Sequence, residues 1–82
     1  MKTRYTDTPI TAGEMTIIPL KETDIYYVNN KDSLSFYVSN QPIGIVIDSP
    51  QGKWAIDING EQVPLDNYIR EIPSLAEVLD NL

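Results

Sequence analysis

The side chains that could do chemistry in this 82-residue chain are carboxylates, serines and tyrosines, because histidine and cysteine are both absent. Without histidine the chain lacks the usual general base, and without cysteine it lacks the strong thiolate nucleophile. Ser-His-Asp and Cys-His arrangements and metal sites built on histidine or cysteine are therefore excluded. No phosphate-binding glycine loop and no G-x-S-x-G turn occur. The sequence predicts a protein that is not an enzyme and holds no cofactor and no metal.

Two weaker chemical alternatives can be formulated. A serine among 33, 35 and 39 could pair with Lys31 or Lys53, which requires a buried lysine of depressed pKa. The segment 57–61 has the composition of a calcium loop, but Gly60 stands at its fourth position, whereas an EF-hand needs glycine at the sixth. A hairpin turn at Asn59-Gly60 explains that segment more simply.

Tyrosines mark the first candidate binding surface. Tyr26, Tyr27 and Tyr37 fall on two segments that should pair as strands, and alternation requires Tyr26 or Tyr27 to share a face with Tyr37. Tyrosine is enriched in the centres of protein interfaces. We interpret the three rings as candidate contacts for a protein partner. The alternatives are a cross-strand pair that only stabilises the sheet, or a face that the helix covers.

Acidic residues mark the second candidate surface. The net charge is −6, and residues 44–82 carry seven acids and two bases, net −5, against five acids and four bases, net −1, in residues 1–43. This charge disfavours direct contact with nucleic acid or anionic lipid, and it is compatible with a basic protein partner. Asp57, Glu61 and Asp66 are the candidate contacts. An alternative function is that of an acidic nucleic-acid mimic that inhibits a DNA- or RNA-handling enzyme, as small phage and anti-restriction proteins do.

Composition bounds the architecture that must position these residues. Leu, Ile, Val and Phe make up 23 of 82 residues, enough for a folded domain with a thin core. We expect a flexible arm over residues 1–13 and a single domain over 14–82. The missing cysteines favour the cytoplasm, and no stretch has the apolar length of a membrane span. The thin core is consistent with homodimerisation.

Most of the domain has the composition of short strands. Alternation predicts that Leu34, Phe36 and Val38 share one face of their strand, and that Trp54, Ile56 and Ile58 point inward while Ala55 points outward. Gly44 predicts a bulge or a close approach by a bulky group. Polar turns are expected at 21–23, 30–32, 40–42, 49–52 and 59–60. The expected strands are 15–20, 24–29, 33–39, 43–48, 53–58 and 61–63.

The C-terminal residues have helical periodicity. Apolar side chains recur at i, i+3, i+4 and i+7 from Leu65 and again from Leu75, with Pro73 between the two segments. Ser74 and Glu77 have the spacing of a capping box. The sequence therefore predicts an α+β fold: a small antiparallel meander or curled sheet of five to six strands, with one or two short helices packed on one face.

Overall fold

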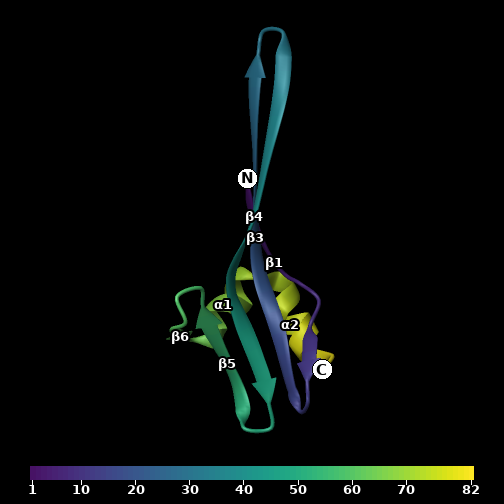
Figure 1. The fold of residues 1–82 in the computed structure, drawn as a ribbon, viewed down its shortest axis with the longest axis vertical. Coiled ribbons are helices and arrows are strands. Elements are labelled where there is room, and N and C mark those ends of the chain that lie inside the picture. Colours follow the sequence, from purple (N-terminus) through teal and green to yellow (C-terminus); the bar gives the residue numbers. More distant parts are fainter.

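The computed structural model describes all 82 residues as six strands and two helices (Figure 1). All strand pairs are antiparallel, and the order in the sheet is β1-β3-β4-β5-β6, with β2 also paired to β3. The predicted α+β fold, an antiparallel sheet followed by two C-terminal helices, is confirmed. The elements are β1 (Lys2–Thr6), β2 (Ile10–Ala12), β3 (Met15–Asn30), β4 (Ser33–Ser49), β5 (Gly52–Asp57), β6 (Gln62–Val63), α1 (Leu65–Glu71) and α2 (Pro73–Asp80). Neither helix has the length and apolar character needed to cross a lipid bilayer.

Strands β3 and β4 are much longer than the sequence suggests. The turns expected at 21–23 and 40–42 are wrong: both segments lie inside one ladder, with Glu22 opposite Gln41 and Thr23 opposite Asn40. The polar side chains stay in the sheet because they find partners there, as Glu22 does with Arg4. The only irregularity is a bulge where the register shifts between Leu20 and Lys21.

Pro19 lies inside β3 at a position that tolerates a missing N–H. On one side Pro19 is opposite Ile45 of β4. On the other side β1 ends opposite Leu20 and β2 begins opposite Ile17, so Pro19 sits at the break between these two edge strands. Its carbonyl accepts a hydrogen bond from the Asp7 amide at 2.9 Å. A residue in an antiparallel strand directs its N–H and its C=O to the same side. The N–H that Pro19 lacks would therefore point into the break between β1 and β2, and not toward β4.

Residues 1–13 are not a loose arm, and this expectation is corrected. They form β1 and β2, which pair with β3 over eight positions in total, five for β1 and three for β2. The Thr-rich composition that suggested irregular structure suits strands, because β-branched residues pack well on a pleated surface.

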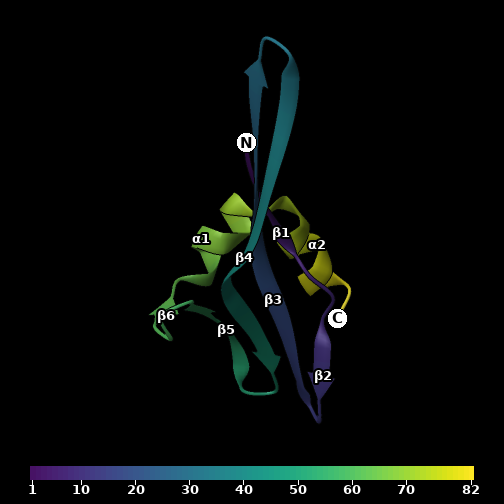
Figure 2. The same cartoon turned by 45° about the horizontal axis from the view of Figure 1, so that its top comes forward.

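The helices cover one face of the sheet, here called the inner face (Figures 1 and 2). The sheet contributes Ile18, Leu20, Val46 and Ala55, all fully buried. The helices add the remaining members of the core, Tyr68, Ile72, Leu75 and Leu79. The fold is therefore a two-layer structure with a single small core.

The expectation that Trp54 and Ile56 point inward, with Ala55 outward, is wrong. Ala55 is 0% exposed beneath the helices, and Trp54 is half-buried on the opposite face of the sheet, where it is paired with Ile47. Ile58 lies beyond β5 and is exposed. The reason is steric, because the helices approach closely only over the face with the smaller side chains.

Gly44 shows this close approach directly and confirms its prediction. It lies next to the bulge, and a Cβ built on it would stand 2.5 Å from the Ile56 carbonyl oxygen and 3.0 Å from the Tyr68 hydroxyl. Any side chain here would displace either β5 or α1.

Two local predictions at chain reversals need correction. The hairpin between β5 and β6 exists, but only Gly60 of its loop has positive φ, so the loop is not the type I′ turn that an Asn-Gly pair usually forms in a hairpin. The Gly60 amide donates to the Asp57 carbonyl at 3.0 Å, as in a type I turn followed by a left-handed glycine. Helix α2 begins at Pro73 and has no side-chain cap, because the Ser74 hydroxyl instead bonds the Thr6 hydroxyl of the sheet. The predicted capping box is therefore absent.

Candidate protein-interaction surface

The β3–β4 hairpin extends far beyond the rest of the molecule. The register of β1 ends at Asp24, and past Ile25 the strands β3 and β4 pair only with each other. We call residues 25–38 the arm and the remainder the body. The arm makes the molecule 57 Å long against 23 and 21 Å in the other directions, and it projects away from both helices (Figures 1 and 2).

The arm exposes most of the large apolar side chains that it carries. Seven of them have exposed fractions between 47% and 70%, with Tyr27 the highest. Scattered exposed apolar residues are ordinary, but a contiguous set on one element indicates an interaction site. The seven are Tyr26, Tyr27, Val28, Leu34, Phe36, Tyr37 and Val38.

Both faces of the arm are apolar. Tyr26 is directly opposite Tyr37, so these two rings share a face, while Tyr27 is opposite Phe36 on the other face. Ile25 and Val38 form a further pair on the Tyr27 face. The sequence predicts that Tyr37 shares a face with either Tyr26 or Tyr27, and in the structure it shares a face with Tyr26. Tyr27 is separated from them by the plane of the ribbon.

Sequence reasoning missed Phe36, Leu34 and Val38 as surface residues, because strict alternation assigned them to a core. A signal for their exposure was present. Residues 25–28 are apolar on both faces of the ribbon, and they pair with residues 35–38, of which all but Ser35 are apolar. The chain has only two short helices that could cover them. One helical layer cannot cover both faces of a ribbon.

The arm is almost uncharged. Lys31 and Asp32 at its turn are its only ionisable residues apart from the tyrosines, and their charges cancel. All remaining net charge, −6, belongs to the body. The isolated two-stranded ribbon is marginally stable in water on general grounds, so contacts that cover it stabilise it as well.

The root of the arm is held by Asp24. Its carboxylate lies 3.5 Å from the N-terminal ammonium of Met1, which donates to the Ile25 carbonyl at 2.7 Å. The Tyr26 hydroxyl beside this carboxylate, together with the N-terminal charge, lowers the pKa of Asp24 below its ordinary value. The same contact raises the pKa of the Tyr26 hydroxyl. Tyr26 is therefore partly engaged with the body, whereas Tyr27 is not.

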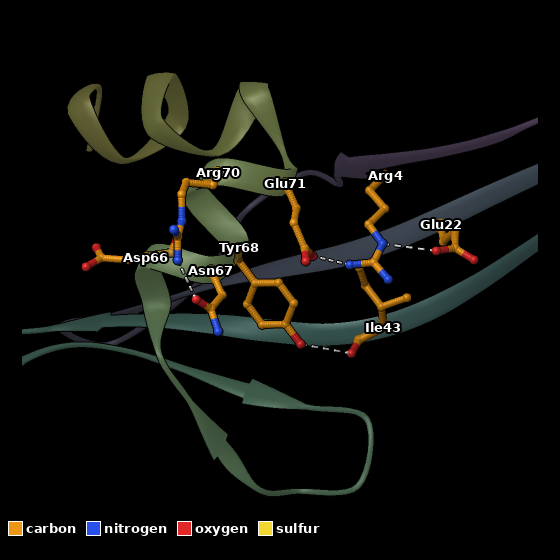
Figure 3. A network of polar contacts seen from close by, with 8 residues as sticks. All are labelled: Arg4, Glu22, Ile43, Asp66, Asn67, Tyr68, Arg70 and Glu71. Carbon is orange, nitrogen blue, oxygen red and sulfur yellow. Dashed lines mark hydrogen bonds and ion pairs between the residues drawn. The ribbon is translucent and has the colours of Figure 1, made fainter.

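A separate polar cluster lies where the sheet meets α1 (Figure 3). Arg4 on β1 donates from Nε to Glu22 of β3 at 3.0 Å and from Nη1 to Glu71 of α1. The Tyr68 hydroxyl donates to the Ile43 carbonyl at 3.4 Å. The two carboxylates raise the pKa of the Arg4 guanidinium, with the Glu22 hydrogen bond as the first cause. These contacts join β1, β3 and α1, and a structural role accounts for them.

A shallow pocket of about 410 Å³ adjoins this cluster. Its charged groups, Arg4 and Glu22, are already paired with each other, and Arg4 also pairs with Glu71. No group of three or more carboxylates is close enough to hold a metal ion. Arg4, Glu22, Gln41, Pro42, Ile43, Ile58 and Tyr68 line the pocket.

The three predicted acidic contacts lie in the body, whereas the three tyrosines lie in the arm. Asp57 is half-buried, and its Oδ1 accepts the backbone amides of Asn59 and Glu61 at 2.9 and 3.0 Å, so it orders the β5–β6 turn. Asp66 is exposed in the first turn of α1, where a negative charge stabilises the helix dipole. The structure therefore separates the six candidate residues into two regions. Mimicry of nucleic acid by the acidic group stays a prediction.

Comparisons of the chain with protein-family models, with curated proteins and with solved structures found no match.

Proposed function

We propose that this protein is a small non-catalytic interaction module that binds a protein partner through the arm. The observation that supports the proposal most is the set of seven apolar side chains exposed on an element that projects away from both helices. A second support is chemical: the chain has no histidine or cysteine, and the two charged residues that line its one pocket, Arg4 and Glu22, already pair with each other.

The area of the arm suits a specific interface. Four aromatic rings bury about 150–250 Å² each when fully covered. With exposed fractions of 54–70%, the rings alone offer on the order of 500 Å², before the three aliphatic side chains are added. A standard interface buries roughly 800 Å² per partner. The arm alone therefore approaches the size of such an interface.

The chemistry of the arm indicates a partner surface that is apolar where it meets the rings. A basic rim on the partner is compatible with the net charge of −6, and it would contact the acidic body rather than the neutral arm. We place the protein in the cytoplasm, because a secreted domain of this size often depends on disulfides.

The test is an affinity capture from native lysate with three baits. The wild-type chain and Ile58→Ser should retain the same partner, because Ile58 is as exposed as the arm residues, at 62%, but lies outside the arm. The double variant Tyr27→Ser/Phe36→Ser should lose it by about 30-fold or more, the effect of a hot spot. Equal retention by all three baits contradicts the proposal. Circular dichroism of each bait checks that the body stays folded.

A further inference from the structure

The sheet has a second unpartnered apolar surface, on the face opposite the helices. Register places Ile17 beside Ile47 and Ile47 beside Trp54, and a second row runs from Pro19 through Ile45 to Ile56. We call these six residues the open face. All are half-buried by one another, and neither helix lies over them (Figure 2).

Charge is segregated between the two faces of the body. Within β3, β4 and β5 the acidic residues are Glu22, Asp24, Asp48 and Asp57, and the register places all four on the inner face. The open face has no acidic strand residue. Lys21 borders it and is neutralised by Asp7, with Nζ 2.6 Å from the carboxylate. A chain of net charge −6 thus presents an uncharged apolar face, which a second equally acidic copy can approach without like-charge repulsion at the contact.

The arm has the shape and composition to cover such a face. Alternation along β3 places Tyr27 on the same side of the strand as Ile17, and this side of the arm also carries Ile25, Phe36 and Val38. From Ile25 to Asn30 the arm is about 17 Å long, at roughly 3.4 Å per residue. The part of β3 in the body, Met15 to Asp24, is about 30 Å long by the same rise. The arm continues its own strands outward and so cannot fold onto its own open face (Figure 1).

Resting on the proposed function, we infer that the partner is a second copy of this chain. In a two-fold symmetric dimer, the Tyr27 side of each arm packs on the open face of the other copy. The two ribbons then pack face to face as sheets do, with Trp54 and its isoleucine neighbours beneath Tyr27 and Phe36.

The area favours a reciprocal contact over a single one. One side of the arm offers on the order of 400 Å² from Tyr27, Phe36, Leu34 and Val38, and it covers a similar area of the open face. A single arm-on-face contact therefore buries about 800 Å² in total, less than the roughly 1,200 Å² that stable specific interfaces need. Two reciprocal contacts bury about 1,600 Å², a standard interface. Because only the two reciprocal contacts of a closed dimer reach the area of a stable interface, we infer a dimer and not an open chain of copies joined by single contacts.

The experiment measures the mass of the purified full chain by light scattering over a concentration series. The emission of Trp54, the only tryptophan, is followed in parallel as a probe on the open face. The wild type should move from 9.3 kDa to twice that mass as concentration rises, with a blue shift of the emission over the same range. The arm variant Tyr27→Ser/Phe36→Ser and the face variant Ile47→Lys should each weaken association by about 30-fold or more. Ile58→Ser, which is 62% exposed but lies outside both the arm and the open face, should leave association unchanged.

Mixing the arm variant with the face variant gives the decisive result. Each variant alone has no intact arm-on-face contact, but a mixed pair regains one, so the mixture should associate more tightly than either variant alone. No regain on mixing, or a wild type that stays monomeric at all concentrations, overturns the inference. If the wild type is monomeric but another protein is still captured through the arm, only the self-association is wrong. If capture is also insensitive to the arm variant, the proposed function fails with it.

Discussion

The body and the arm are built from the same two strands, yet one contains the core and the other has none. In the body, β3 and β4 lie between β1, β2 and β5 and beneath the helices, and Ile18, Leu20 and Val46 are fully buried. In the arm the same strands continue with side chains at least as large, and these stay exposed. What differs is what packs against the strands. Apolar side chains in a strand become a core only where a second layer covers them.

The largest expected contrast is in amide hydrogen exchange. At concentrations where the chain is monomeric, amides of the body such as Ile18 and Val46 should exchange only by global unfolding. The amides of Tyr26 and Tyr37, which are paired across the arm, should exchange about 100-fold faster or more. Exchange followed by NMR measures both regions in one sample. Equal protection of the two regions in the monomer would break the comparison. Protection of the arm that rises with concentration would sharpen it.

A matched pair of leucines tests the same contrast in stability. Leu20→Ala removes a fully buried side chain and should lower the free energy of unfolding by about 2–5 kcal/mol. Leu34→Ala removes the same atoms from the arm, where Leu34 is 53% exposed, and should change stability by no more than about 0.5 kcal/mol. Urea unfolding followed by circular dichroism measures both. A large loss from Leu34→Ala in the monomer would mean that the arm packs on the body.

Gly44→Ala should have an intermediate effect. Its Cβ would stand 2.5 Å from the Ile56 carbonyl oxygen, which is backbone and cannot rotate away, so β5 or α1 must shift. Overpacking of this kind costs about 1–3 kcal/mol. Ser39→Ala, an exposed position near the root of the arm, is the control and should be neutral. Thermal unfolding of the two variants measures the difference, and an unchanged stability of Gly44→Ala would contradict the close approach of β5 and α1 to Gly44.

The smallest effect concerns pH. Lys21 lowers the pKa of Asp7, and the Tyr26 hydroxyl with the N-terminal ammonium lowers that of Asp24, both from an ordinary value of 3.8. A carboxyl whose folded pKa is depressed stabilises the fold above its unfolded pKa and loses this contribution as pH falls through the folded value. Stability should therefore decrease on acidification below about pH 4.

Substitution at either carboxylate tests this assignment. Asp7→Asn and Asp24→Asn should each flatten the decrease in stability between about pH 4 and pH 2. Asp32→Asn, in the turn of the arm with no ion pair, is the matched control. This variant should lose stability between about pH 4 and pH 2 as the wild type does. Unfolding midpoints across this pH range measure all three variants. If the midpoint depends on pH in Asp7→Asn and Asp24→Asn as it does in the wild type, these two carboxylates do not cause the decrease.

Several elements could be predicted because their signals are local. Both helices follow from the i, i+3, i+4, i+7 spacing from Leu65 and Leu75, and the turn at Asn59-Gly60 follows from turn chemistry, although its type does not. The tyrosines could be identified as candidate contacts for the same reason, since alternation alone places Tyr37 on a face with one of its neighbours.

Other features could not be predicted, because each depends on a partner distant in the sequence. Glu22 and Asn40 look like turn residues until Arg4 and the facing strand are in place. Trp54 looks like a core residue until α1 packs over Ala55 and Gly44 instead. The pairing of residues 1–13 with β3 has no strong periodic signal of its own.

The α+β class, the absence of histidine and cysteine chemistry, and the net charge of −6 all follow from the amino-acid sequence. These properties depend on composition and on spacing along the chain. Which face of the sheet forms the core, and which stretch of β3 and β4 forms an exposed arm, depends instead on how the elements pack together. Both are decided by where the second layer lies, because a helix covers only one face of the sheet and reaches only part of its length.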